Sequence, residues 1–175
     1  MTELINSETS SDQFHDFFEH VVDSLIDVYC AFDPEDRVWV YKEIMDATFP
    51  CMFEMMDLFT EGCTPLQLKG LAMAKDYWLN GGVNDPELAH TQSYMMLQLC
   101  NNKKFFPTGL DHIRAAQQFA IRTLLYTGVV PQPKMDAFGY LEDFFEAYQS
   151  FPVPLEDVVA IINKYFASII GVQKI

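Results

Sequence analysis

Basic residues are scarce in this sequence. Its 175 residues include 11 lysines and arginines against 25 aspartates and glutamates, which gives a net charge of −14 and an isoelectric point near 4.4. Nucleic acids and anionic membrane surfaces would repel such a chain, so we expect neither as a partner. A basic protein is the partner that this charge favours.

Long apolar runs are also missing. No stretch approaches the ~20 apolar residues that a membrane-spanning helix needs. The first residues, MTELINSETSSD, lack the positive and apolar regions of an export signal, so we expect a cytoplasmic protein. The cysteines form no Cys-x-x-Cys motif and are expected to be reduced, mostly buried thiols rather than disulfides; they are Cys30, Cys51, Cys63 and Cys100.

Motifs for catalysis are absent as well. The sequence contains no Gly-x-Ser-x-Gly, no phosphate-binding glycine loop and no His-Glu-x-x-His. One Glu-x-x-His motif, Glu87 to His90, is present, whereas a di-iron site in a helical bundle needs two. We therefore predict a protein that is not an enzyme and has no catalytic residues, metal ligands or cofactor. The alternative is a metal-binding or enzymatic domain whose site combines Glu87 and His90 with Asp111 and His112.

Apolar residues are plentiful, and their spacing is helical. Half of the residues are hydrophobic and 14% are aromatic, which is enough for one core without disulfides or metal. Apolar residues recur every three or four positions, and no alternating strand pattern appears. The sequence thus predicts an all-α fold: one globular domain over residues 11–175, preceded by a flexible tail at 1–10.

Capping signals divide this domain into seven or eight helices in an irregular bundle. The first helix is expected from about 11 to 31, after a capping box at Ser10 and Gln13. The second starts at Asp33-Pro34 and is kinked or split by Pro50. The later helices are expected to span about 64–80, 86–101, 108–127, 134–149 and 155–170.

Negative charge is concentrated in the first third of the chain. Residues 1–61 hold 15 of the 25 acidic residues but two of the 11 basic ones, Arg37 and Lys42. Five acids of the first helix are spaced by three or four positions and fall within an arc of about 80°. Like charges at this spacing repel each other. This face is either a solvated surface or a docking site for a cationic partner, which would relieve the repulsion.

We predict that the partner-binding surface lies on the first two helices. Nearby aromatics such as Phe32, Trp39 and Tyr41 either provide contacts in the interface or belong to the core. A second acidic and aromatic segment, 136–148, has apolar spacing that fits a core face. The predicted partner-binding residues are Asp12, Asp16, Glu19, Asp23, Asp27, Asp33, Glu35, Asp36, Trp39 and Glu43.

In size, acidity, helical character and lack of catalytic motifs, the chain resembles the small acidic immunity proteins that bacteria make against nuclease toxins. The resemblance implies a bacterial inhibitor that covers the cationic active-site cleft of a basic toxin domain. A related possibility is a nucleic-acid mimic that acts on a DNA-binding protein. A scaffold or regulatory subunit is a further alternative, and the oligomeric state stays open.

Overall fold

The computed structural model describes residues 7–79, 112–124 and 137–171. Within these ranges the chain is helical and contains no strand, which confirms the all-α prediction. The described residues hold six helices, fewer than the seven or eight expected, and the helix predicted at 86–101 lies outside them. The helices are α1 (Ser7–Ala31), α2 (Arg37–Asp57), α3 (Pro65–Leu79), α5 (His112–Leu124), α6 (Ala137–Tyr148) and α7 (Leu155–Ile170).

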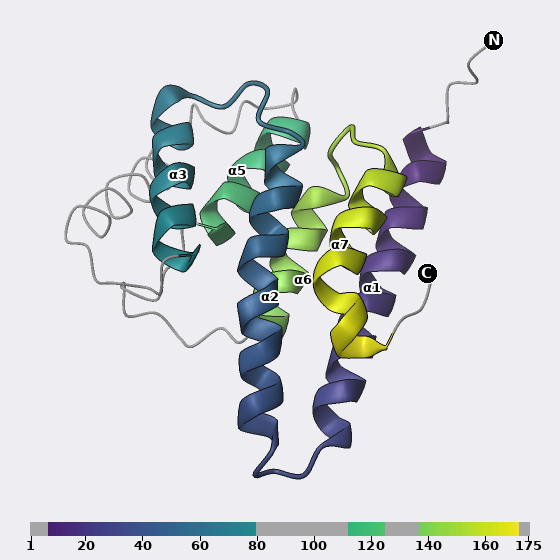
Figure 1. The fold of residues 1–175 in the computed structure, drawn as a ribbon. Coiled ribbons are helices and arrows are strands. Elements are labelled where there is room, and N and C mark those ends of the chain that lie inside the picture. Colours follow the sequence, from purple (N-terminus) through teal and green to yellow (C-terminus); the bar gives the residue numbers. More distant parts are fainter. Residues whose placement is uncertain (1–6, 80–111, 125–136, 172–175) are drawn as a thin grey trace.

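Helix α2 occupies the centre of this arrangement. It contacts α1, α3, α5, α6 and α7, while α6 packs on α1 and α5 as well as on α2. Figure 1 shows α3 on one side of α2 and α1 and α7 on the other, while α5 passes behind α2. The joined ends of α1 and α2 extend past the other labelled helices, so the connection between them projects from the body of the molecule.

One apolar core joins the described helices. Buried side chains of α1, α2, α3, α5, α6 and α7 belong to a single cluster. Tyr148 of α6 ties this core to α2, because its hydroxyl donates a hydrogen bond of 2.6 Å to the Met55 carbonyl oxygen. The largest fully buried side chains are Phe14, Leu25, Ile44, Phe49, Met52, Met55, Met56, Ile121, Phe144, Tyr148 and Phe166.

The ends of two helices follow the sequence signals. At the start of α3, the Gln67 backbone N–H donates to the Thr64 hydroxyl oxygen (3.2 Å), and the Thr64 N–H donates to Gln67 Oε1 (2.7 Å). These two bonds form the predicted capping box. Helix α7 ends at Gly171, whose φ of 65° is the left-handed conformation that favours glycine there.

The first two helices differ from the prediction in their limits. Helix α1 begins at Ser7, inside the segment assigned to a tail, and Ser10 lies within it. Asp33 and Pro34 open a turn in which the Asp33 carbonyl accepts the Arg37 N–H (3.0 Å), so that the turn leads into α2. Pro50 does not split α2. Its neighbours Phe49 and Cys51 are buried, so core packing stabilises the helix where proline removes a backbone donor.

The described cysteines differ in how deeply their side chains are buried. Cys51 is fully buried, and this desolvation raises the pKa of its thiol well above the usual range. Cys63 is half-buried and Cys30 is exposed, so the expectation of burial is wrong for Cys30, which lies at the projecting end of α1. All three are free thiols, and Cys100 lies outside the described residues. None of the described helices combines the length and apolar character needed to cross a bilayer.

Candidate protein-binding surface

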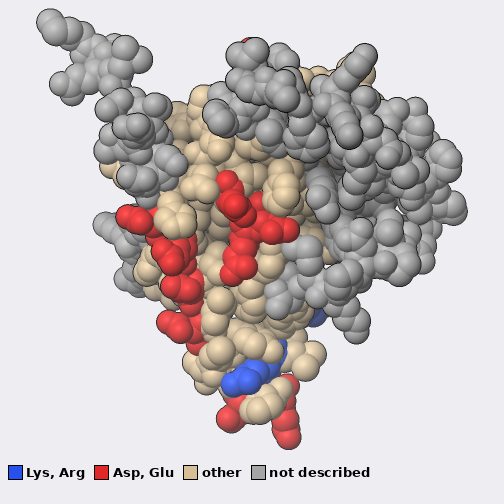
Figure 2. Space-filling view, turned by 180° about the vertical axis from the view of Figure 1, so that it is seen from behind, with Lys and Arg blue, Asp and Glu red and all other residues tan. Residues whose placement is uncertain are grey.

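Four carboxylates of α1 lie exposed along one side of the helix. They are Asp16, Glu19, Asp23 and Asp27, and all are turned to solvent as their spacing predicts. Asp12 also lies in α1, but its side chain is outside the part that the structure describes. Figure 2 shows a band of acidic side chains following α1 on this side of the molecule, with no basic side chain inside the band.

Lysines neutralise carboxylates elsewhere. Ion pairs between described residues join Lys42 to Asp46, Lys75 to Asp57 (2.5 Å) and Lys164 to Glu54 (2.6 Å). Each of these pairs uses an acid of α2. Among the described residues, no lysine or arginine is paired with the α1 carboxylates, so the charge of this surface is uncompensated.

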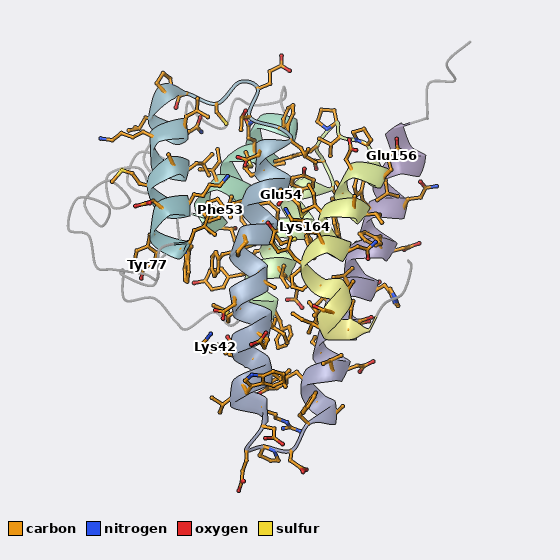
Figure 3. All side chains as sticks on the ribbon, viewed as in Figure 1. Lys42, Phe53, Glu54, Tyr77, Glu156 and Lys164 are labelled. Carbon is orange, nitrogen blue, oxygen red and sulfur yellow. The ribbon has the colours of Figure 1, made fainter. Side chains whose placement is uncertain are left out.

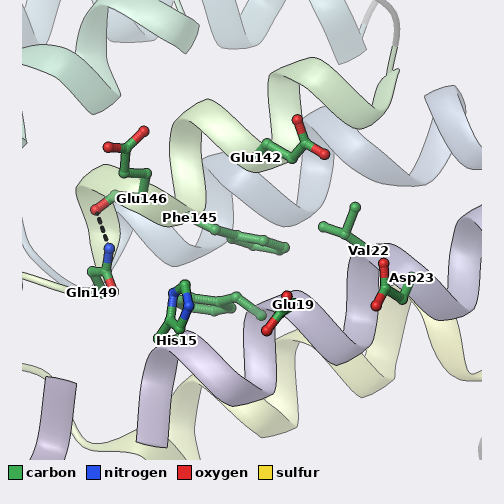
Figure 4. A pocket seen from close by; sticks show the side chains of 9 residues that line it. His15, Glu19, Val22, Asp23, Glu142, Phe145, Glu146 and Gln149 are labelled. Atoms are coloured by element: carbon green, nitrogen blue, oxygen red, sulfur yellow. Dashed lines mark hydrogen bonds between the residues drawn. The ribbon is translucent and has the colours of Figure 1, made fainter. Parts of the chain in front are cut away.

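A groove separates α1 from α6 on the same side. Its volume is about 410 Å³. The stacked rings of Phe18 and Phe145, whose centroids are 4.2 Å apart and whose planes differ by 8°, belong to its lining. Both rings are almost fully buried, so they form the floor of the groove and pack α1 against α6 there. The lining consists of His15, Phe18, Glu19, Val22 and Asp23 of α1, with Glu142, Phe145, Glu146 and Gln149 of α6 and the turn after it (Figure 4).

Acids stand on both walls of this groove. Glu19 and Asp23 come from α1, and Glu142 and Glu146 come from α6. Each pair is separated by four positions, which places its members on one face of their helix. Figure 2 shows the acids over α6 as a second group, separated from those of α1 by uncharged surface. We call Asp16, Glu19, Asp23, Asp27, Glu142 and Glu146 together the acidic face.

The sequence indicated the acids of α6 as a separate acidic segment, but not that they share a surface with α1. Four aromatic residues of the 136–148 segment are buried as expected of a core face: Tyr140, Phe144, Phe145 and Tyr148. Glu142 and Glu146, however, are exposed and line the groove. Their spacing was visible in the sequence, but nothing there indicated that α6 lies beside α1, because that contact joins segments far apart in the chain.

The connection between α1 and α2 forms a second exposed feature. Residues 32–39 make up what we call the hairpin tip, and its acids Asp33, Glu35 and Asp36 are exposed. Trp39 is 61% exposed and Phe32 is 38% exposed. Their rings meet edge to face, with centroids 6.5 Å apart.

The other predicted residues near the tip divide between surface and core. Glu43 is exposed on α2, one turn beyond Trp39. Tyr41 packs against the core, where its ring meets those of Tyr29 and Phe138. Of the three aromatics that the sequence left open between interface and core, Phe32 and Trp39 are therefore at the surface and Tyr41 is not.

The described residues can be searched for the metal site that the sequence left as an alternative. No group of three or more histidine, cysteine or acidic side chains in these ranges could hold a metal ion. The alternative site named from the sequence used Glu87, His90 and Asp111, which lie outside the described residues, and His112, whose side chain is also outside them. That alternative stays a sequence-based hypothesis.

Comparison of the chain with protein families, with curated proteins and with solved structures gives no match. The features of the described residues that indicate a function are the charge, exposure and shape of the acidic face and the hairpin tip.

Proposed function

We propose that this chain is an acidic protein-binding inhibitor and that its partner is a basic, nuclease-type toxin domain in the cytoplasm. The observation that carries the proposal is the acidic face, whose α1 carboxylates have no cationic partner among the described residues. Repulsion among the α1 carboxylates opposes folding. A cationic partner surface would relieve this repulsion, and the relief would favour binding. A protein that acts on nucleic acid presents such a surface at its active-site cleft.

The proposed mechanism is occlusion. The acidic face docks over the cationic cleft of the toxin, so that nucleic acid no longer reaches it. Glu19, Asp23, Glu142 and Glu146 give the groove four carboxylates around a partly apolar lining. A lysine or arginine side chain of the partner fits such a groove, with its aliphatic stem against the rings and its charge near the carboxylates. Long-range attraction accelerates the encounter, and the groove then fixes the register.

Charge reversal at the groove tests this proposal. The chain is first co-expressed with the basic protein encoded by an adjacent gene, and the purified complex is assayed for inhibition of nuclease activity. In the variant Glu19→Lys/Asp23→Lys, we expect association at low salt to slow about ten-fold or more, with a weaker dependence on salt. Stopped-flow measurement of the association rate at several salt concentrations gives both quantities.

The matched control carries the same change in charge elsewhere. Glu61→Lys/Glu156→Lys reverses two exposed acids outside the acidic face, and we expect it to slow association much less. Figure 3 shows Glu156 on the side of the molecule opposite to the view in Figure 2. Equal slowing by both variants would mean that net charge alone matters, and it would refute docking at the acidic face. Circular dichroism of both variants establishes that the fold is kept.

A further inference from the structure

Trp39 has a large aromatic side chain that is mostly exposed to solvent. Its side chain is 61% exposed, and Val38 beside it is 76% exposed. The hairpin tip projects beyond the other labelled helices, so none of them lies over it (Figure 1). Exposed tryptophans are rare in surfaces without a partner, whereas tryptophan is enriched among the residues that dominate protein interfaces.

Carboxylates flank Trp39 along α2. Asp36 precedes it by three positions and Glu43 follows it by four, so both are its neighbours on the helix surface. Both acids are exposed. The nearby Lys42 forms its ion pair with Asp46 rather than with either of these two acids. An aromatic ring between two carboxylates is a complementary surface for a cation with a flat face.

Arg37 holds this surface in place. Its guanidinium donates hydrogen bonds to the carbonyl oxygens of Phe32 (3.0 Å) and Cys30 (3.1 Å), and lies over the Tyr29 ring at 5.5 Å from the centroid. The one cation of the hairpin tip is thus used to close the turn. A tip ordered before binding loses less conformational freedom when a partner docks.

We propose that the hairpin tip binds an arginine of the basic partner, with the guanidinium stacked on Trp39 and its N–H groups donating to Asp36 and Glu43. Arginine is favoured over lysine because its planar guanidinium stacks on an indole and bonds two carboxylates at once. A second copy of this chain fits less well, because the acids of two tips would face each other. The inference rests on the proposed function and deepens it by naming the group that the partner supplies.

Two peptides of equal charge test the inference on the whole protein. One is a blocked peptide of alternating arginine and glycine, and the other replaces each arginine by lysine. We expect the arginine peptide to bind about two-fold to five-fold more tightly by titration calorimetry. The shift of the Trp39 indole N–H signal in the nitrogen-15 NMR spectrum locates the site. The chain has two tryptophans, so the signal absent from Trp39→Leu is that of Trp39.

Variants separate stacking from charge. Trp39→Leu keeps an apolar side chain and should abolish the preference for arginine, whereas Trp39→Phe should keep part of it. Asp36→Asn/Glu43→Gln should weaken both peptides. Leu68→Ala, which shortens an exposed apolar residue of α3, should change neither affinity.

Several results would overturn the inference. They are no binding of either peptide, equal binding of both, or a preference for arginine that survives in Trp39→Leu. Self-association that is lost in Trp39→Leu would assign the tip to a second copy instead. Failure of this proposal differs from failure of the proposed function. If the tip does not bind arginine, the two peptides and the Trp39 variants show it. If the proposed function is wrong, the association rate with the partner does not change in Glu19→Lys/Asp23→Lys.

Discussion

The carboxylates of α1 and those of α2 belong to the same acidic third of the chain, yet the fold treats them differently. On α2, Glu54 accepts hydrogen bonds from Lys164 and from the Tyr165 hydroxyl, both at 2.6 Å, and so joins α2 to α7. Figure 3 shows Glu54 and Lys164 facing each other between these helices. On α1, Glu19 and Asp23 face the groove without a cation among the described residues.

This difference teaches that charge compensation follows helix contacts rather than position in the sequence. Lysines of α3 and α7 meet the acids of α2, because α2 lies between those two helices. Helix α1 instead faces α6, whose exposed residues at the groove are also acidic. The α1–α6 contact must therefore be stabilised by something other than ion pairs.

The largest effect is expected from removing the ring packing under the acidic face. Phe145→Ala should lower the free energy of unfolding by about 3–5 kcal/mol, because it leaves a cavity beside Phe18. Urea denaturation measures the change. Its exposed neighbour provides the control, since Glu146→Gln should alter stability by less than about 0.5 kcal/mol. A loss below about 1 kcal/mol in Phe145→Ala would mean that aromatic packing does not hold α1 to α6.

An intermediate effect is expected where α2 meets α7. The hydrogen bond from Lys164, followed by that from Tyr165, lowers the pKa of Glu54. A lowered pKa in the folded state stabilises the protein above the ordinary carboxyl pKa, and this contribution disappears as the pH falls through the lowered value. Lys164→Met should raise the pKa of Glu54 and flatten this part of the pH dependence of stability.

The pKa of Glu54 can be followed by NMR titration of its carboxyl group. Lys42→Met is the control, since its ion pair with Asp46 lies within α2 and does not involve Glu54. An unchanged pKa in Lys164→Met would contradict the role given to this lysine.

The smallest effect has the opposite sign. Glu19→Gln removes repulsion with Asp16 and Asp23 at helical spacing, so it should raise the free energy of unfolding by about 0.2–0.5 kcal/mol at low salt. The gain should shrink as salt screens the charges. Glu156→Gln should instead lower stability, because Glu156 lies in the first turn of α7, where a negative charge is favourable. Destabilisation by Glu19→Gln would show that the α1 acids already have compensating contacts.

Features set by neighbouring residues could be predicted from the sequence. The capping box of Thr64 and Gln67 and the glycine that ends α7 depend on bonds within one turn, and both are present. The exposure of Asp16, Glu19 and Asp23 also followed from helical spacing alone.

Features that depend on tertiary contacts could not be predicted in this way. The groove needs Phe18 beside Phe145, and the sequence contains no signal that pairs α1 with α6. The same limit applies to Pro50, where core packing overrides the local tendency to break the helix. Cys30 lies at the surface because the joined ends of α1 and α2 extend beyond the other labelled helices, and only the packed arrangement of the helices shows this (Figure 1).

The central position of α2 determines which parts of the protein unfold locally and which unfold only with the whole molecule. Because α2 packs against each of the other described helices, its backbone amides reach water only when several contacts are lost together. Amides near Met52 and Met56, whose side chains are fully buried, should thus exchange their hydrogens for deuterium through global unfolding. The projecting ends of α1 and α2 lack such cover and should exchange by local fraying. Brief local openings would expose these amides while the centre of the protein stays closed, and between openings the Arg37 hydrogen bonds keep the hairpin tip ordered.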